Sequence, residues 1–444
     1  MASCFRPAYL IVPALAIPLA WKAYEMTSHP APPEPPRPEA VEAGLALFNH
    51  NWTVKDPLAG GDGLGPVFNA RSCVECHSQG GAGGGGPVDK NVTVYGLRPQ
   101  VKTVIKDLPH IGVVHQKATR PEYQETLAHV VPNLPGSPSL SLEKINDPGF
   151  VCTTGNDVVI TQRNTPALFG DGQLDMIPED ELHKAQRQNS TAARLVGLSR
   201  AKDPNIRGRV ARLPDGRLGR FGWKAEFATL REFVKAACAN EIGLSNPDRP
   251  QARPMAHREY QGTGTDLTEA QCALMTDFIR GLEAPRRVEP SEPGERARVK
   301  AGEETFARIG CADCHTPDLG SIKGFYSDLI LHDMGNTLAA GIGSYGEAIA
   351  PPNSTTVPVA SEWKTPALWG VADSAPYLHD GRAETLEAAI EAHQGEASGV
   401  TTAFKNLPPA EQQGVIAFLN TLKAPKSPTA TTSPGVAAVR TASR

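Results

Sequence analysis

Two copies of a Cys-x-x-Cys-His segment carry the clearest chemistry in this sequence. The first copy consists of Cys73, Cys76 and His77, and the second of Cys311, Cys314 and His315. Two cysteines three positions apart lie on one helical turn, so both thiols can bond a single flat ring. The histidine that follows can then reach an iron at the centre of that ring. This is the covalent c-type haem signature, and it predicts two haem c groups with His77 and His315 as iron ligands.

A zinc site is the competing interpretation, because two Cys-x-x-Cys pairs could form a four-thiolate cage. The pairs lie much farther apart than zinc ligands usually do, and both are followed directly by histidine, which favours haem. Of the eight cysteines, three remain outside the two motifs and the leader: Cys152, Cys238 and Cys272. We expect one disulfide and one buried thiol among them, or three buried thiols.

The composition excludes some classes of protein. The chain has 444 residues and a net charge of −4, with no basic block of the kind that binds nucleic acid. It contains 40 prolines and 42 glycines, which indicates many loops. No alternating apolar run is long enough for a large sheet, so we expect a mainly α, loop-rich fold.

The two ends of the chain differ from the rest. Residues 1–25 read as an export signal or an N-terminal membrane anchor, because Arg6 precedes an apolar stretch at 8–21. Export agrees with covalent haem attachment, so we expect a periplasmic protein, free or tethered by this segment. Residues 26–39 are a proline-rich linker, and residues 426–444 have the composition of a disordered tail.

An internal repeat organises the remainder. A Gly-x-x-x-Phe pattern precedes each haem motif, NTPALFG at 164–170 matches KTPALWG at 364–370, and the segments 267–285 and 407–425 align without a gap. Four matches in the same order predict a duplicated haem domain. We place the first, catalytic copy at 40–288, with insertions, and the second, electron-transfer copy at 289–425.

The second copy offers a candidate sixth iron ligand. Residues 384–393 have helical spacing, with His393 on the same side as the apolar residues. A histidine on an apolar side is usually an ordinary core residue, but a nearby iron favours ligation. The competing ligands are His332, Met334 and His379.

The first copy lacks this ligand. Trp223 and Ala237 occupy the positions that correspond to His379 and His393 in the second copy. The first iron is therefore expected to be five-coordinate and open to a small molecule, while the second stores or relays electrons. The loop histidines His110 and His115 could still close the first iron in one redox state.

Together these motifs identify a resemblance. GLGPVFNARSCVECH, RNTPALFG, GRFGWKA, LHDMG, KTPALWG and APYLHDGRAETLEAAI resemble the bacterial di-haem cytochrome c peroxidase superfamily, over roughly residues 40–424. Within it the chain is similar to the di-haem oxidoreductases, also called thiol oxidoreductases. The resemblance implies two tandem cytochrome-c-like domains and a small cytochrome or copper protein as electron donor; a homodimer is a further expectation.

The resemblance also implies roles for individual residues. Trp223 matches a tryptophan that relays electrons between the haems, and Glu241 matches an acid that moves a proton between peroxide oxygens. His393 stands where the peroxidases usually have methionine, and Asn164 matches an asparagine that helps to hold calcium. A buried carboxylate has a raised pKa and can both accept and return a proton, which supports the role of Glu241 independently.

Two departures from the peroxidase pattern bear on which substrate we expect. Phe233 replaces the distal glutamine, and Thr93 stands where peroxidases have the loop histidine that closes the first iron. The leading hypothesis is a peroxidase-like enzyme that reduces peroxide at the first haem with electrons passed through the second. The alternatives are a di-haem oxidase or oxygenase of an organic or protein substrate, and a non-catalytic electron carrier with two six-coordinate irons.

Overall fold

The computed structural model describes residues 35–97, 108–126, 152–154, 158–189, 197, 203–340, 345 and 360–426. The expected leader, most of the linker and nearly all of the tail lie outside these residues, so those expectations remain predictions. Within the described part of the chain, no helix is long and apolar enough to cross a membrane. The described residues form one compact unit.

The helices are short, as the proline and glycine content predicts. They are α2 (Pro38–Asn49), α5 (Asp171–Asp175), α6 (Glu179–Gln188), α8 (Leu230–Ala237), α9 (Glu269–Arg280), α10 (Pro293–Ile309), α11 (Leu386–Ala392), α12 (Ser398–Lys405) and α13 (Pro409–Leu419). Capping boxes begin α8 at Thr229 and α9 at Thr268, where each threonine accepts from the third backbone N–H of its helix.

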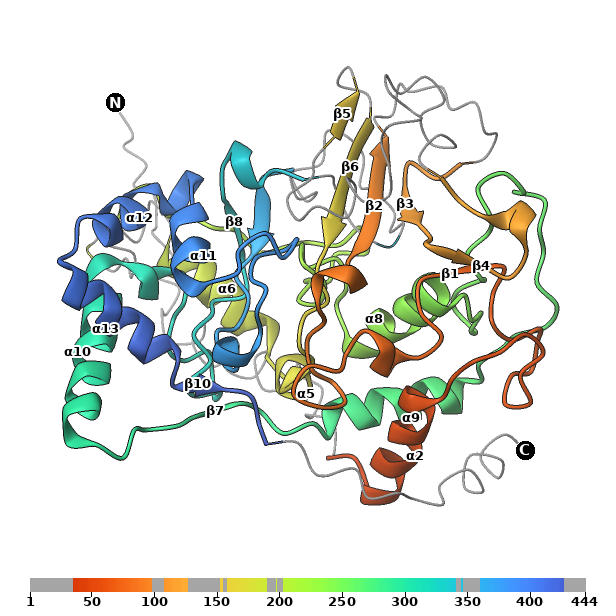
Figure 1. Cartoon of the computed structure of the whole chain (residues 1–444), viewed down its shortest axis with the longest axis horizontal. Coiled ribbons are helices and arrows are strands. Elements are labelled where there is room, and N and C mark those ends of the chain that lie inside the picture. The colour runs from red at the N-terminus through yellow and green to blue at the C-terminus, as the bar shows by residue number, and fades with distance from the viewer. Residues whose placement is uncertain are drawn as a thin grey trace, which may run out of the picture. The chain divides into compact units, whose positions relative to one another are not determined.

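The strands make the fold mixed and helix-rich rather than mainly α. They are β1 (Val67–Phe68), β2 (Val92–Leu97), β3 (Ile111–Val114), β4 (Lys117–Ala118), β5 (Cys152–Thr154), β6 (Val158–Arg163), β7 (Arg286–Arg287), β8 (Leu331–Asp333), β9 (Glu362–Lys364) and β10 (Leu422–Lys423). Four of them form an antiparallel sheet in the order β3-β2-β6-β5 (Figure 1). The expectation of a mainly α chain is therefore corrected. Five of the six residues of β2 are buried, so it lacks the alternation that marks a half-exposed strand.

The repeat appears in the structure as two equivalent helix crossings. In one, α2 packs against α9, and in the other α10 packs against α13 (Figure 1). A Cβ on Gly44 would lie 1.9 Å from the Leu274 carbonyl oxygen, and one on Gly302 would lie 1.9 Å from the Gly414 carbonyl oxygen. Glycine is therefore needed at both positions, because the paired backbones touch there.

The phenylalanines of the repeat lie next to these crossings. The Phe48 ring centroid is 4.8 Å from that of Phe278, and that of Phe306 is 5.4 Å from that of Phe418. The same two rings face the haem motifs, since Phe48 lies 6.3 Å from the His77 ring and Phe306 lies 6.4 Å from the His315 ring. Each helix crossing thus positions one motif histidine. The domain limits at 288 and 289 remain a prediction.

Candidate haem sites

The first Cys-x-x-Cys-His motif begins with a single 3-10 turn, Cys73–Glu75. His77 Nδ1 donates to the carbonyl oxygens of Gly84, at 3.2 Å, and Pro166, at 3.1 Å. These bonds place the proton on Nδ1 and leave Nε2 as the free, metal-binding nitrogen. Burial lowers the pKa of His77 to about 4, so its imidazole is neutral, as an iron ligand must be.

The second motif has the same geometry. It begins with the 3-10 turn Cys311–Asp313, and His315 Nδ1 donates to the Tyr326 carbonyl oxygen at 3.0 Å. Burial, followed by the proximity of His393, lowers the pKa of His315 to about 4. Both motif histidines are therefore oriented by backbone carbonyls, with Nε2 available.

A cavity of about 300 Å³ adjoins the first motif. It is lined by Cys73, Cys76, His77 and Glu241, and it continues to residues of the second half such as Trp369. Apolar side chains, including Phe48, Met275 and Ile279, make up much of its wall. Two attachment cysteines, a neutral histidine with a free nitrogen and an apolar wall fit a covalently bound haem.

Glu241 lies in this cavity on a π-helical turn, Cys238–Ile242, that extends α8. Its Oε2 accepts a hydrogen bond of 2.7 Å from Asn69 Nδ2, whereas its Oε1 is buried and has no partner of normal geometry among the described residues. Burial raises the pKa of Glu241, and the Asn69 hydrogen bond, the charge of His115 and the Tyr345 hydroxyl partly oppose that shift. A buried acid with a raised pKa can take up and return a proton.

Phe233 and Tyr345 complete the wall beside Glu241. The Phe233 ring lies 5.9 Å from the Tyr345 ring and 5.2 Å from the Phe227 ring. Sequence reasoning selected Phe233 but missed Tyr345, which lies in the second half of the chain. No local pattern around Tyr345 points to the first haem motif.

Trp223 also lines the cavity. Its indole N–H donates to the Asn164 carbonyl oxygen at 3.0 Å. The Asn164 side-chain amide donates to the Gly86 carbonyl oxygen at 3.2 Å and to Asn91 Oδ1 at 3.0 Å. Asn164 thus ties Trp223 to the loop around the first motif, and a calcium ion there remains a prediction.

His393 ends α11, as its C-cap. Its Nδ1 donates to the Ala389 carbonyl oxygen at 2.7 Å, which leaves Nε2 free, and burial lowers its pKa. It lies close enough to His315 to lower the pKa of that residue. The two histidines therefore have matching tautomers, each with Nε2 free, which makes His393 a candidate second ligand for the iron at His315.

The competing ligands of the second iron are placed differently. His332 Nδ1 lies 2.7 Å from Glu396 Oε2, and its Nε2 lies 3.0 Å from Asp328 Oδ2, so both nitrogens are engaged. His379 stacks on Trp363 at 3.8 Å. Met334 is partly exposed. Of these candidates, His393 combines a free Nε2 with proximity to His315.

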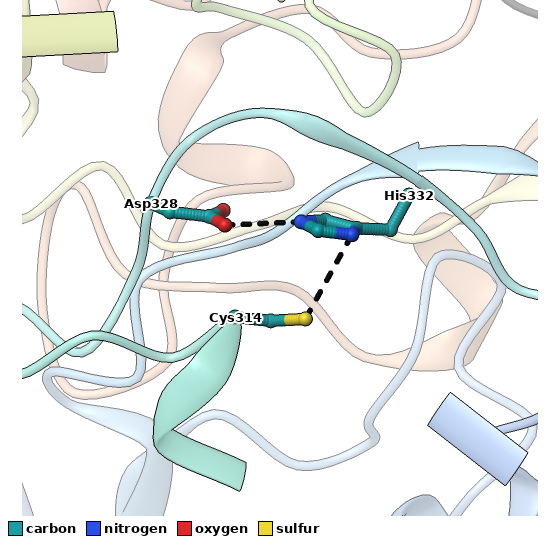
Figure 2. A group of neighbouring side chains, drawn as sticks. All are labelled: Cys314, Asp328 and His332. Atoms are coloured by element: carbon teal, nitrogen blue, oxygen red, sulfur yellow. Dashed lines mark hydrogen bonds and ion pairs between the residues drawn. The ribbon is translucent and has the colours of Figure 1, made fainter. Parts of the chain in front are cut away.

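Figure 2 shows Cys314, Asp328 and His332, whose ligand atoms all lie within 4.8 Å of one another, as in a small metal site. Cys314 is one of the two cysteines that would attach the second haem, and its Sγ lies 3.8 Å from His332 Nδ1. A thioether sulfur is a poor ligand for a hard metal ion. We therefore assign this cluster to the surroundings of the second haem.

The loop histidines of the first copy are not arranged as iron ligands. The His115 ring nitrogens donate to Glu125 Oε2 at 2.8 Å and to the Asn240 carbonyl oxygen at 2.9 Å. Burial lowers the pKa of His115, but the Glu125 carboxylate outweighs it and the net shift is upward. His115 would have to break both bonds to reach an iron, and His110 is exposed.

Comparison with known proteins fits this geometry. Residues 152–422 match the family described as "Di-haem oxidoreductase, putative peroxidase". The chain belongs to this family. Membership implies two haems, in agreement with the two Cys-x-x-Cys-His motifs of this di-haem oxidoreductase.

Among individual proteins, the chain is similar to the methylamine utilization protein MauG of Methylorubrum extorquens. The two are 33% identical over 176 residues, which make up 38% of this chain and 46% of that protein. The match thus spans less than half of the relative's length.

Two solved structures show more distant likeness. Hydrazine synthase of Kuenenia stuttgartiensis aligns with a TM-score of 0.40 and 15% identity, over 95% of this chain and 99% of that one. A MauG-like protein associated with microbial copper homeostasis aligns with a TM-score of 0.28 and 17% identity, over 56% of this chain and 90% of that one. Likeness at this level carries no argument about activity.

Proposed function

We propose that this protein is a periplasmic, peroxidase-like di-haem oxidoreductase that reduces peroxide at its first haem with electrons relayed through its second. The observation that carries the proposal is the asymmetry of the two sites. The cavity at His77 contains a buried acid, Glu241, and no second histidine among the described residues that line it. His315 has such a histidine nearby, His393.

Each site would hold its haem through residues of this chain. Cys73 and Cys76 would form the thioether bonds of the first haem and Cys311 and Cys314 those of the second, with His77 and His315 as iron ligands. When bound, the haems supply the electron-transfer chemistry and, at the first iron, a position for a small ligand.

The chain's own contribution to catalysis is proton handling and exclusion of water. Glu241 would take a proton from the proximal oxygen of the substrate and return it to the distal oxygen, which leaves as water. Asn69 holds one oxygen of Glu241, at Oε2, and so orients the carboxyl group for this exchange. The apolar rings of Phe233 and Phe48 line the cavity and would help to keep bulk water out of it.

Electrons would come from a small cytochrome or copper protein and pass the second haem before Trp223. The Trp223 indole is fixed by its bond to Asn164, and its ring lines the cavity of the first site. A fixed aromatic ring between two redox centres is a suitable relay because it need not reorganise when the electron passes.

An oxidase or oxygenase of an organic or protein substrate is the second candidate. The apolar Phe233, which lines the same cavity as Glu241, favours it, since such a wall suits an organic group better than peroxide alone. An electron carrier, in contrast, would need both irons to be six-coordinate.

A low-temperature electron spin resonance spectrum of the oxidised protein, before and after hydrogen peroxide, tests the proposal. We expect one high-spin and one low-spin haem, with the high-spin signal lost on peroxide addition. Two low-spin haems that are indifferent to peroxide, even when half-reduced, would mean an electron carrier.

Glu241→Gln tests the proton step. We expect loss of peroxide turnover with both haems still attached, by analogy with the 10²–10⁴-fold contribution that general acid–base groups typically make. Glu259→Gln is the matched control, because Glu259 is an exposed carboxylate outside the cavity. Equal turnover in the two variants would remove Glu241 from the mechanism.

A further inference from the structure

The second half of the chain contributes a residue to the first haem site. Tyr345 follows the second haem motif in sequence, yet it lines the same cavity as Cys76 and Glu241. Its ring packs against Phe233 at 5.9 Å and against Phe227 at 6.4 Å, two residues of the first half. These aromatic contacts hold the tyrosine ring against the wall of the first haem site.

The Tyr345 hydroxyl approaches the carboxylate of Glu241 and favours its charged form. Asn69 already occupies Oε2 of that carboxylate, and Oε1 is the buried oxygen that has no partner of normal geometry. The surrounding wall is apolar, so the tyrosine hydroxyl is well suited to be the second hydrogen-bond donor to Glu241.

We propose that Tyr345 is a positioning residue of the first haem site, whose hydroxyl donates a hydrogen bond to Glu241 and so fixes the orientation and proton affinity of that acid. This proposal rests on the proposed function in one respect, that Glu241 is the proton-transfer group. It adds that the first site is incomplete without the second half of the chain.

The groups around Glu241 determine its pKa and how that pKa changes when Tyr345 is altered. Burial is the largest influence and raises its pKa, while Asn69, the His115 charge and the Tyr345 hydroxyl lower it. His115 is itself paired with Glu125, so its charge stays in place when Tyr345 is altered. Removing the hydroxyl should therefore raise the pKa of Glu241.

The Tyr345 hydroxyl has further neighbours that affect its own pKa. Glu226 and Cys76 lie near it and, with Glu241, raise the pKa of the tyrosine after burial, which has the largest effect. Tyr345 is therefore a neutral phenol that keeps its proton and donates it in a hydrogen bond. Cys76 carries no charge once its sulfur is bound to haem.

Tyr345→Phe in the full-length haem-loaded protein isolates the hydroxyl, because the ring contacts to Phe233 and Phe227 are kept. The readout is the infrared carboxylic C=O band of Glu241, identified as the band that Glu241→Gln removes and followed as a function of pH. We expect the band to persist to higher pH in Tyr345→Phe and to move to higher frequency, because a hydrogen bond to the carboxyl group is lost.

Tyr123→Phe is the control, since Tyr123 packs against His257 and Tyr260 and has no contact with Glu241 among the described residues. Its band should match that of the wild type. A Tyr345→Phe band with unchanged frequency and unchanged midpoint, or no band in either protein, would overturn the proposal. A purely structural role of the ring would move neither property.

Peroxide turnover separates this proposal from the proposed function. If the wild type does not turn over peroxide but the infrared shift is present, the peroxidase assignment fails and the role of Tyr345 stands. If turnover is present, and its low-pH limb moves upward in Tyr345→Phe together with the midpoint of the Glu241 band, both stand. An upward shift of the limb with an unchanged Glu241 band would refute the action of Tyr345 through that acid.

Discussion

Replacing Gly302 by alanine should disrupt the helix crossing that supports the second haem motif. A Cβ at this position would lie 1.9 Å from the Gly414 carbonyl oxygen and 2.3 Å from the Gly414 carbonyl carbon. These are backbone atoms, so no side-chain rotation relieves the overlap and α10 must move away from α13. Phe306, one turn along α10, would move with it and lose its place beside His315.

The size of the effect follows from two opposing contributions. Overpacking of this kind costs about 1–3 kcal/mol, and contact with backbone on a rigid helix places it near the upper end. Alanine in a helix interior returns about 1 kcal/mol relative to glycine. We expect the free energy of unfolding to fall by about 2 kcal/mol. For a unit of the size of the second copy, 289–425, this lowers Tm by roughly 6 °C.

Two other glycines provide matched controls. Gly294 lies in the same helix with no atom within 4 Å of its would-be Cβ, so Gly294→Ala should be neutral or stabilise by up to about 1 kcal/mol. Gly414 is the partner across the crossing, but its own Cβ would meet Gly302 Cα at 3.4 Å, which is ordinary contact. Gly414→Ala should therefore cost much less than Gly302→Ala.

Thermal unfolding of the haem-loaded protein, followed by circular dichroism, gives the order of the three variants. The absorption spectrum of the second haem reports whether His315 is displaced. The reasoning would be refuted if Gly302→Ala and Gly294→Ala had the same Tm, or if Gly414→Ala were the most damaging of the three.

Two further predictions concern single histidines. His393→Ala should change the spin state of the second haem and leave the first unchanged, whereas His257→Ala should change neither; an unaltered second-haem spectrum would assign the ligand to another residue. The ion pair of His115 with Glu125 stabilises the fold, and the folded-state pKa of His115 lies above its usual value of 6.5. That stability is fully present below the unfolded pKa and is lost as pH rises through the folded pKa. Chemical denaturation as a function of pH should show this loss, and Glu125→Gln should abolish it.

Local spacing in the sequence determined the parts of this protein that depend on near neighbours. The two Cys-x-x-Cys-His motifs were recognisable because haem attachment uses residues within one turn. The repeated Gly-x-x-x-Phe indicated that the helices before the two haem motifs are equivalent. Glycine and phenylalanine one turn apart lie on one side of a helix, and in the structure that side forms the crossings of α2 with α9 and of α10 with α13. His393 fell at the end of a predicted helix for the same reason.

The four-stranded sheet was decided by tertiary structure. Val92–Leu97 pairs with Val158–Arg163 in an antiparallel register, across a long stretch of chain. Most residues of the first strand are buried, so the alternation that reveals a half-exposed strand is missing. A short buried run of this kind is ambiguous in sequence, and only the partner strand makes it a sheet.

The surroundings of the distal acid were also decided by tertiary structure. Sequence resemblance singled out Glu241 and Phe233, but nothing near Tyr345 in the chain indicates a place in the first haem cavity. The engagement of both nitrogens of His115, which makes it unsuited to ligate iron, depends likewise on Glu125 and Asn240. Periodicity and spacing report on residues within a few turns, whereas these contacts exist only once distant segments have folded against one another.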